Sequence, residues 1–331
     1  MKPVNDKRKV FSGVQPTGNM HIGNYLGAFR NWVRLQDQYE TIYCVVDLHA
    51  LTVPGDPAEL HKNRLDAAKV LLAVGIDPNR SLVYLQSQVP QHAELSWILG
   101  TMTPTGVLNR MTQFKEKSDQ AGSNLGLYSY PVLMAADILL HRCDLVPVGD
   151  DQRQHLEMTR DLAERFNNRY GDVFPVPDAL IPPTSARVMS LVEPTTKMSK
   201  SHPNDRSRIL IVDTPDDIRK KVRSAVTDSD PDVRYDWDAK PGISNLLEIM
   251  ADCTGSTIDA LVDEYGAGGY GAFKDAVAEA IITELAPVRA AHRALEDADV
   301  ARVMQRGALD ARTSAEGYQR EVRNAVGLQR I

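Results

Sequence analysis

Short apolar runs alternate with helix-like segments through the first 190 residues, and this alternation constrains the fold more than any other feature of the sequence. Runs rich in β-branched and other apolar residues predict five strands, at Lys9–Val14, Ile42–Leu48, Leu82–Gln86, Leu145–Gly149 and Val188–Leu191. Continuous apolar runs of this kind suit strands that are buried on both faces. We therefore expect an α/β fold built on a Rossmann-like, doubly wound parallel sheet.

Two of the intervening segments carry clear helix signals. The first places four apolar residues on one helical face, at steps of four, three and four residues: Ile22, Leu26, Phe29 and Val33. The second begins at Pro57, where Asp56 can cap the free N–H groups, and it stops at Gly75. Both segments lie between predicted strands, which is the alternation that a parallel sheet produces.

The pattern becomes helical after residue 192. The segment "TPDDIRKKVRSAV" opens with Thr214 and Asp217 at the spacing of a capping box, and the glycine-rich "YGAGGYGAF" interrupts the helices once. We expect four parts, with the following residues: a Rossmann-like domain 1–192, a loop 193–205, a smaller all-helical domain 206–290, and C-terminal helices 291–331 that pack back toward the first domain.

Composition excludes several classes of protein. The chain has 331 residues and a formal net charge of −6, which argues against broad adhesion to DNA or other nucleic acid but permits a local basic patch. No run approaches the roughly 20 apolar residues of a membrane helix, and no secretory signal is visible at the N-terminus. Cys44, Cys143 and Cys253 are far apart and form no CxxC pair. We therefore expect a cytoplasmic protein without a disulfide framework or a zinc site.

One polar segment lies where open α/β sheets bind ligands, between the first strand and the first helix. It reads "FSGVQPTGNMHIGNYLGAF". His21 and Asn24 fall on the same side of the first helical turn, and both can donate a hydrogen bond without carrying a fixed charge. Taken alone, the segment could equally be a glycine-rich turn that caps an ordinary helix.

A second polar segment, "TTKMSKSHPN", places Lys197 and Lys200 three residues apart between Pro194 and Pro203. The prolines disfavour a continuous helix through the segment. Two ammonium groups on such a loop indicate a site for an anionic ligand.

Together these two segments resemble the HIGH and KMSKS pair of class I aminoacyl-tRNA synthetases. HIGN occupies residues 21–24 and KMSKS residues 197–201. "GDDQRQH" resembles the GxDQxxH segment of the tyrosyl and tryptophanyl members. Segments along essentially the whole chain, among them "YPVLMAADILL" and "KPGISNLL", are similar to the bacterial tryptophanyl enzymes. The one departure, Asn24 at the last position of HIGH, is common in that family.

The resemblance implies an enzyme that forms an adenylate from L-tryptophan and ATP, releases pyrophosphate and passes tryptophan to tRNA(Trp). It implies Mg²⁺ held through the ATP phosphates and water, with no metal site made by side chains. It also implies a homodimer, with catalysis in residues 1–192 and anticodon recognition in residues 206–290. Residues 200–223, where seven basic side chains face four acidic ones, and the arginine-rich C-terminus are expected to contact tRNA phosphates.

By the same resemblance, five residues are expected to act at the triphosphate: His21, Asn24, Lys115, Lys197 and Lys200. Lys117 is a further candidate, although Lys115 and Lys117 could also belong to an ordinary solvated loop. Fourteen residues are expected to contact ATP: Gln15, Pro16, Thr17, Gly23, Asn24, Gly149, Asp150, Asp151, Val188, Lys197, Met198, Ser199, Lys200 and Ser201. A loop that closes its lysines on the leaving pyrophosphate would bind the transition state more tightly than the ground state.

The side chains on one predicted helix indicate which amino acid the enzyme binds. Tyr130, Met134 and Asp137 project from one face of a predicted helix, and Asp137 lies in the apolar stretch "LMAADILL". A carboxylate buried there needs a donor, and the indole N–H of tryptophan is a donor only. The alternative is a carboxylate bonded to a neighbouring backbone or side-chain group. Eight residues are expected to line the pocket: Phe11, His49, Tyr130, Met134, Asp137, Val146, Val148 and Gln152.

Three other functions remain open from the sequence. A tyrosyl-tRNA synthetase has similar motifs, but Met134 offers an apolar wall where the tyrosine enzymes have a polar residue. A small-metabolite nucleotidylyltransferase shares an HxGH-type loop but lacks KMSKS and a helical domain of this size. A non-catalytic paralogue that binds tRNA or another protein is expected to have eroded motifs, and both motifs are intact here.

Overall fold

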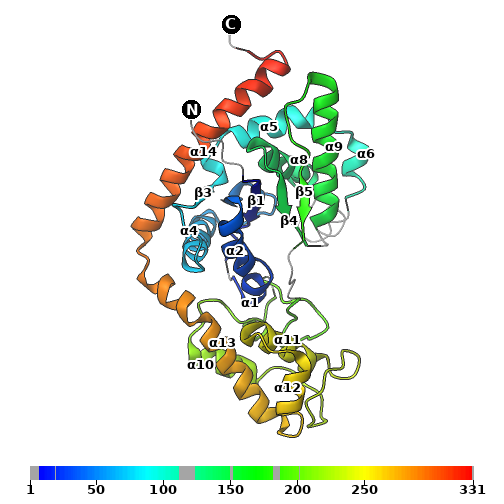
Figure 1. The fold of residues 1–331 in the computed structure, drawn as a ribbon, viewed down its shortest axis with the longest axis vertical. Helices are drawn as coiled ribbons and strands as arrows, with labels where there is room; N and C mark the ends of the chain where they lie inside the picture. The colour runs from blue at the N-terminus through cyan, green and yellow to red at the C-terminus, as the bar shows by residue number, and fades with distance from the viewer. Residues whose placement is uncertain are drawn as a thin grey trace.

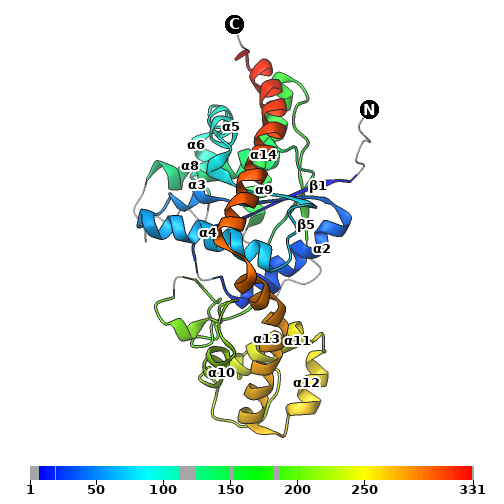
Figure 2. The same cartoon turned by 90° about the vertical axis from the view of Figure 1, so that its left-hand side faces the viewer.

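The computed structural model describes residues 7–18, 20–111, 124–149, 152–181, 187–200 and 202–329. Figure 1 shows an elongated molecule with an α/β region at one end and a helical region at the other. The last helix, α14 (Asp297–Ala325), leaves the helical region and runs back along the outside of the α/β region (Figure 2).

Five parallel strands form one sheet in the order β3-β2-β1-β4-β5. Their bounds are β1 Lys9–Val14, β2 Glu40–Val45, β3 Ser81–Leu85, β4 Leu145–Pro147 and β5 Asp178–Leu180. The predicted parallel α/β sheet is confirmed, and four of its strands coincide with predicted runs. Because β2 lies on one side of β1 and β4 on the other, the strand order reverses between β1 and β4. The carboxyl ends of these two strands therefore form the crevice where open sheets bind ligands.

The prediction of a strand at Val188–Leu191 is wrong. This segment makes only an isolated antiparallel bridge, between Met189 and Lys197. The side-chain amide of Asn245, on helix α11 (Pro241–Thr254), bonds both the N–H and the C=O of Met189, so a helix satisfies these groups instead of a neighbouring strand. Sequence reasoning missed β5, because it has only three residues and no continuous apolar run.

The helix that follows β1 has three parts: α1 (Ile22–Asn24), a π-helical turn η1 (Tyr25–Phe29) and α2 (Arg30–Gln38). Its predicted apolar face is confirmed, because its first three apolar residues are buried and Val33 packs against the same core. Tyr25 and Arg30 also reach the helical region. The Tyr25 hydroxyl donates to Glu284 Oε1 at 3.1 Å, so this helix is tied directly to the helical region.

The other helices of the α/β region are α3 Asp47–Ala50, α4 Pro57–Ala73, α5 Gln91–Gly100, α6 Thr105–Leu108, α8 Leu125–Leu140 and α9 Arg153–Tyr170. The predicted start of α4 is confirmed, since Asp56 accepts the N–H of Ala58 at 2.8 Å. Gly75, just beyond its end, has a φ of 106° that favours glycine. Helix α8 packs against both α5 and α9, which explains why most of its residues are buried.

The helical region contains α10 Pro215–Arg223, α11 Pro241–Thr254, α12 Ile258–Tyr265 and α13 Gly269–Ala294. Thr214 caps α10 by accepting the N–H of Asp217 at 3.2 Å, as the sequence predicts. Helix α13 packs against α10 and α11 and also reaches α4. One apolar cluster runs from the sheet into this region and includes both Val45 and Phe273. Within the described part of the chain, no helix has the length and apolar character to cross a membrane.

Helix α14 packs directly on the edge strand β3. Gly307 makes this possible, because a Cβ at that position would lie 1.8 Å from the carbonyl oxygen of Val83. An exposed edge strand is open to pairing with another chain, and a helix that covers it removes that risk. The close approach of α14 therefore closes one side of the sheet.

We predict that Gly307→Ala lowers the free energy of unfolding by about 3 kcal/mol, because the new methyl group meets a backbone oxygen that cannot move cheaply. Gly317→Ala, on the same helix with no atom within 4 Å of the added carbon, is the matched control. It should change stability by less than about 1 kcal/mol, with alanine favouring the helix. Urea unfolding of both variants measures the difference, and equal stability would contradict the close approach.

Candidate active site

One cavity at the carboxyl ends of β1 and β4 gathers the residues predicted for the amino acid. It has a volume of about 520 Å³ and is lined by these strand ends, by α3 and by one face of α8. All eight predicted residues line it: Phe11, His49, Tyr130, Met134, Asp137, Val146, Val148 and Gln152. Gln15, expected to contact ATP, lines the same cavity, so the two predicted sites adjoin.

Asp137 is only 1% exposed, and three side chains hold its carboxylate. Oδ2 lies 2.8 Å from His49 Nε2, while Oδ1 lies 2.7 Å from Gln86 Nε2 and 2.7 Å from His92 Nδ1. Burial alone would raise the pKa of Asp137, but the hydrogen bonds from His49 and His92 outweigh it and lower the pKa to about 2. The carboxylate is therefore ionised at neutral pH.

This arrangement combines the two alternatives that the sequence left open for Asp137. Donor groups of neighbouring side chains occupy most of the acceptor positions of the carboxylate, as the alternative interpretation expects. A carboxylate has about four lone-pair positions, so three donors leave one position for a further donor. Because Asp137 also lines the cavity, a bound molecule can supply that donor.

Tyr130 links the cavity to the GDDQRQH segment. Its hydroxyl lies 2.7 Å from Nε2 of His155, the buried histidine of that segment. Gln152, from the same segment, lines the cavity at the start of α9. Met134 is half-buried and contributes an apolar surface beside them. The segment therefore supplies one polar residue to the cavity wall and one that holds Tyr130.

The HIGN and KMSKS segments meet in the fold. Lys200 Nζ donates to Thr17 Oγ1 at 3.0 Å, across a sequence separation of 183 residues. The chain just after KMSKS pairs with the start of the HIGN helix, through an isolated antiparallel bridge between Leu210 and His21. This bridge and the Lys200–Thr17 hydrogen bond bring the lysine loop to the N-terminal side of the helix that follows β1.

Burial changes the charges in this region. Burial first, and then the nearby charges of Lys200 and Arg208, lowers the pKa of His21 to about 3, so its imidazole is neutral. Burial lowers the pKa of Lys200 to about 8. The buried Nδ1 of His21 has no hydrogen-bond partner among the residues that the structure describes. A neutral imidazole beside two lysines can receive an anion with oxygen acceptors.

The remaining residues expected to contact ATP lie around the HIGN helix, in the segment before it, and after β4. Gly23, Val188 and Met198 are neighbours, since a Cβ on Gly23 would lie 3.3 Å from Val188 and the N–H of Met198 donates to the Val188 carbonyl. Asn24 accepts the N–H of His21 at 3.1 Å. Gln15 and Thr17 are exposed and flank the buried Pro16. Gly149 is exposed after β4 and lines a second, mostly apolar cavity of about 410 Å³.

Five predicted residues lie outside the described part of the chain, namely Lys115, Lys117, Asp150, Asp151 and Ser201. Ser199 and Lys197 are described. Lys197 is exposed, and it forms the isolated bridge with Met189.

Sequence reasoning missed two residues that hold Asp137. Gln86 ends the predicted third strand, and its place at the carboxyl edge of a parallel sheet was a usable signal. His92 gave no such signal, because nothing in the sequence indicates that α5 turns this side chain toward α8. Both are fully buried.

Comparison with known proteins agrees with this geometry. The sequence model of the family "tRNA synthetases class I (W and Y)" matches residues 2–286. A tryptophan–tRNA ligase of Caldanaerobacter subterraneus subsp. tengcongensis is 50% identical over 322 residues, which cover 97% of this chain and 98% of that protein.

Two crystal structures are similar over nearly the whole chain. Tryptophanyl-tRNA synthetase from Mycoplasma pneumoniae matches with a TM-score of 0.86 and 33% identity, covering 97% of this chain and 98% of that one. The enzyme from Campylobacter jejuni, complexed with ADP and tryptophan, matches with a TM-score of 0.84 and 35% identity, covering 97% of this chain and 100% of that one.

The chain therefore belongs to the class I aminoacyl-tRNA synthetases of the tryptophan and tyrosine family. This membership makes it an ATP-dependent enzyme and removes the nucleotidylyltransferase and non-catalytic alternatives. Within the family it is of the bacterial tryptophan type, because tryptophan–tRNA ligases match it at about half identity along almost the entire chain. The tyrosyl alternative is not supported.

We predict that the affinity for ATP falls as the pH rises through the pKa of Lys200, about 8, because the side chain then loses the charge that attracts phosphate. The KM for ATP should increase about tenfold between about pH 7 and about pH 9.5. Lys200→Arg keeps its charge over this range and should show a flat profile. Steady-state kinetics across the pH range measures both enzymes, and an equal rise in the two would exclude Lys200 as the cause.

Proposed function

We propose that the chain activates L-tryptophan with ATP to form tryptophanyl-adenylate and pyrophosphate, and then transfers tryptophan to the 3′ end of tRNA(Trp). One observation carries this proposal. A cavity large enough for an indole ring contains a single ionised, buried carboxylate among its described lining residues, and Gln15 in its wall lies two residues before Thr17, which Lys200 of the KMSKS loop contacts. The names of the relatives support the same reaction.

The amino-acid cavity suits tryptophan for a physical reason. Phe11, Met134 and Val146 supply apolar surface for a large ring, while Asp137 offers the acceptor that the indole N–H needs. A site built around a buried acceptor rejects an analogue without the matching donor by about 10⁴–10⁵. Tyr130 and Gln152 line the same cavity, and we propose that they contact the polar end of the amino acid.

ATP binds, in our proposal, where the two motifs meet. Lys197 and Lys200 stabilise the β- and γ-phosphates as negative charge develops on the leaving pyrophosphate. His21 and Asn24 donate hydrogen bonds from the N-terminus of the helix that follows β1, where the helix dipole also favours an anion. The unpartnered Nδ1 of His21 fits a site that is completed by a ligand.

Mg²⁺ is proposed to enter with ATP, bound by phosphate oxygens and water. Among the described residues, no group of three His, Cys, Asp or Glu side chains is placed to hold a metal ion. A hard cation takes oxygen ligands such as phosphate and water, and it would neutralise charge on the triphosphate. The lysines of the loop supply the protein's own share of that neutralisation.

For tRNA, we propose that residues 206–290 bind the anticodon region and that residues 1–192 hold the reacting end, with residues 193–205 as the loop between them and 291–331 as the returning helices. An open surface on α10 supports a phosphate contact, and its basic residues are Arg206, Lys220, Lys221 and Arg223. Lys221 and Arg223 also pair with Asp213 and Asp275, which reduces the charge that this surface offers. tRNA is used in translation, so we propose a cytoplasmic location.

A homodimer is proposed through an apolar groove on α5, α6 and α8. The groove has a volume of about 550 Å³, and large apolar side chains stand exposed on it, with Trp97 76%, Leu125 77% and Leu51 64% exposed. A cluster of this kind marks an interaction surface. Tyr130 lines both the groove and the amino-acid cavity, so a second copy would lie directly behind the pocket.

The proposed reaction is tested by ATP–pyrophosphate exchange with Mg²⁺ and each standard amino acid in turn. We predict exchange with tryptophan alone. Asp137→Asn, which adds a donor where the wild type has only acceptors, should reduce the preference for tryptophan over tyrosine and phenylalanine by about tenfold or more. Exchange with tyrosine would refute the account of the pocket, and an unchanged preference in Asp137→Asn would remove Asp137 from the recognition of the ring.

The proposed dimer is tested with Trp97→Glu, which places a charge in the lining of the groove. We predict that this variant sediments as a monomer at concentrations where the wild type is a dimer, because an unpaired charge is costly to bury. Leu309→Glu is the control, since Leu309 is 58% exposed on α14 and lies outside the groove. A dimer that survives Trp97→Glu would place the interface elsewhere.

A further inference from the structure

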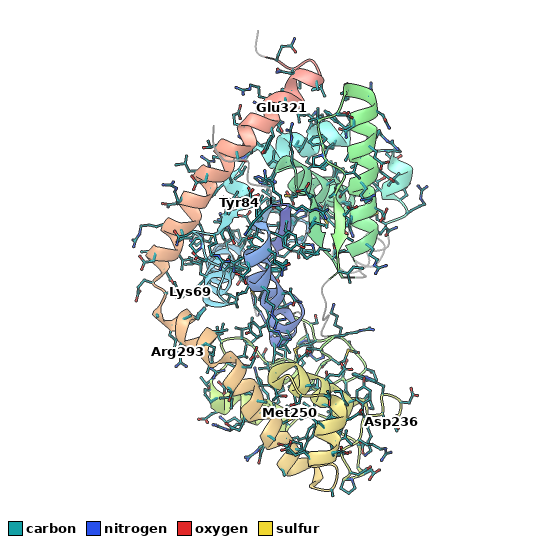
Figure 3. All side chains as sticks on the ribbon, viewed as in Figure 1. Lys69, Tyr84, Asp236, Met250, Arg293 and Glu321 are labelled. Atoms are coloured by element: carbon teal, nitrogen blue, oxygen red, sulfur yellow. The ribbon has the colours of Figure 1, made fainter. Side chains whose placement is uncertain are left out.

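Three buried polar side chains form a chain that ends on Asp137. They are Tyr84 of β3, His92 of α5 and His141, which follows the end of α8. Each is at most 1% exposed, and none of them lines the amino-acid cavity. Figure 3 places Tyr84 within the α/β region. Polar groups are costly to bury unless they are bonded, so this cluster calls for a physical reason.

Short contacts connect His141, Tyr84 and His92, in this order, to Asp137. The Tyr84 hydroxyl lies 2.7 Å from His141 Nε2 and 2.9 Å from His92 Nε2. The other ring nitrogen of His92, Nδ1, lies 2.7 Å from Asp137 Oδ1, a short ion-pair contact whose N–H is not aligned as in a regular hydrogen bond. The Tyr84 and His92 rings stack with a centroid separation of 5.7 Å, which restricts the rotation of both. Asp137 is therefore held by the last member of a rigid, buried set.

The direction of the hydrogen bonds follows from the atoms. The carboxylate can only accept, so Nδ1 of His92 carries the proton. When the His92 ring is neutral, its Nε2 accepts the O–H of Tyr84, and the Tyr84 oxygen in turn accepts the Nε2–H of His141. Nδ1 of His141 is then a bare acceptor, which agrees with its lack of a partner among the described residues. Burial lowers the pKa of His141 to about 3, so that ring is neutral as well.

Gln86 fixes the second bond to the same oxygen. Its Oε1 accepts the N–H of Leu48 at 3.0 Å, so the amide must turn its Nε2 toward Asp137 Oδ1, 2.7 Å away. Oδ1 therefore has two donor groups at 2.7 Å, from His92 and Gln86. Oδ2 has the single contact with His49, itself a cavity residue. The acceptor position left for a ligand is therefore on Oδ2.

We propose that His92, held by Tyr84 and His141, is a positioning residue that fixes the orientation of the Asp137 carboxylate and so determines how strongly the pocket demands a ring N–H. The inference rests on the proposed binding of tryptophan. Without His92, Oδ1 keeps only Gln86, and the carboxylate can rotate or take up a proton. Either change weakens the acceptor that faces the cavity.

The test compares tryptophan with 3-(benzothiophen-3-yl)alanine, in which sulfur replaces the ring N–H with little change in shape. ATP–pyrophosphate exchange gives kcat/KM for both compounds with the full-length wild type, His92→Leu and Tyr84→Phe. We expect His92→Leu to reduce the preference for tryptophan by about tenfold or more, and Tyr84→Phe to reduce it less but in the same direction.

The kinetic constants separate positioning from loss of structure. A hydrogen bond to the ring N–H is made in the ground state and the transition state alike, so the loss should appear in the KM for tryptophan while kcat changes little. A partly unfolded enzyme would instead lower kcat and leave both KM and the preference unchanged. His92→Asn, which keeps an N–H donor near the position of Nδ1, should restore the preference to within about threefold of the wild type.

Leu95→Ala is the matched control, because Leu95 is a fully buried residue of the same helix without a polar group. It should cost stability and leave the preference unchanged. A preference within about twofold of the wild type in Tyr84→Phe and His92→Leu overturns the inference, and Tyr84→Phe decides alone if His92→Leu does not fold. A wild type that does not activate tryptophan refutes the proposed function instead, so the two failures are distinguishable.

Discussion

The buried charge of Asp137 is the constraint on which the amino-acid cavity depends. Removing an ionised carboxylate from water costs several kcal/mol unless donors replace its hydration. Here the donors come from three places, α3, the residue after β3, and α5, which only the folded sheet brings together. The packing of α5 against α8 is therefore also the contact that keeps the carboxylate charged. Recognition of the ligand and stability of the fold depend on the same bonds.

The proposed ATP site depends on positive charge, whereas the amino-acid cavity depends on the negative charge of Asp137. The chain after the KMSKS loop pairs with the start of the HIGN helix at Leu210 and His21, and Lys200 of the loop donates to Thr17. The same helix contacts the helical region, where Arg30 donates to the carbonyl of Asp252 at 2.5 Å and Tyr25 donates to Glu284. These two bonds join the helical region to the helix at whose N-terminus the phosphates are proposed to bind.

Much of the fold and of the cavity could be predicted from the sequence. The first strand, the apolar face of the HIGN helix and the caps at Asp56 and Thr214 depend on local patterns, and the structure contains each of them. The eight residues predicted for the amino acid share one cavity because most of them follow from a helix face or a strand end. The segment at Val188–Leu191 looks like a strand but pairs elsewhere, because Asn245 of a distant helix takes the hydrogen bonds that a neighbouring strand would have made.

The sequence by itself determined the α/β alternation, the two motifs and the apolar surroundings of Asp137, since these depend on residue type and spacing along the chain. Only the tertiary structure decided which donors hold that carboxylate, that α14 covers the edge of the sheet through Gly307, and that Lys200 reaches Thr17. These contacts join residues far apart in sequence. The physical reason is that a buried charge or a close backbone approach is satisfied by whichever group the completed packing brings near, and no local pattern specifies that group.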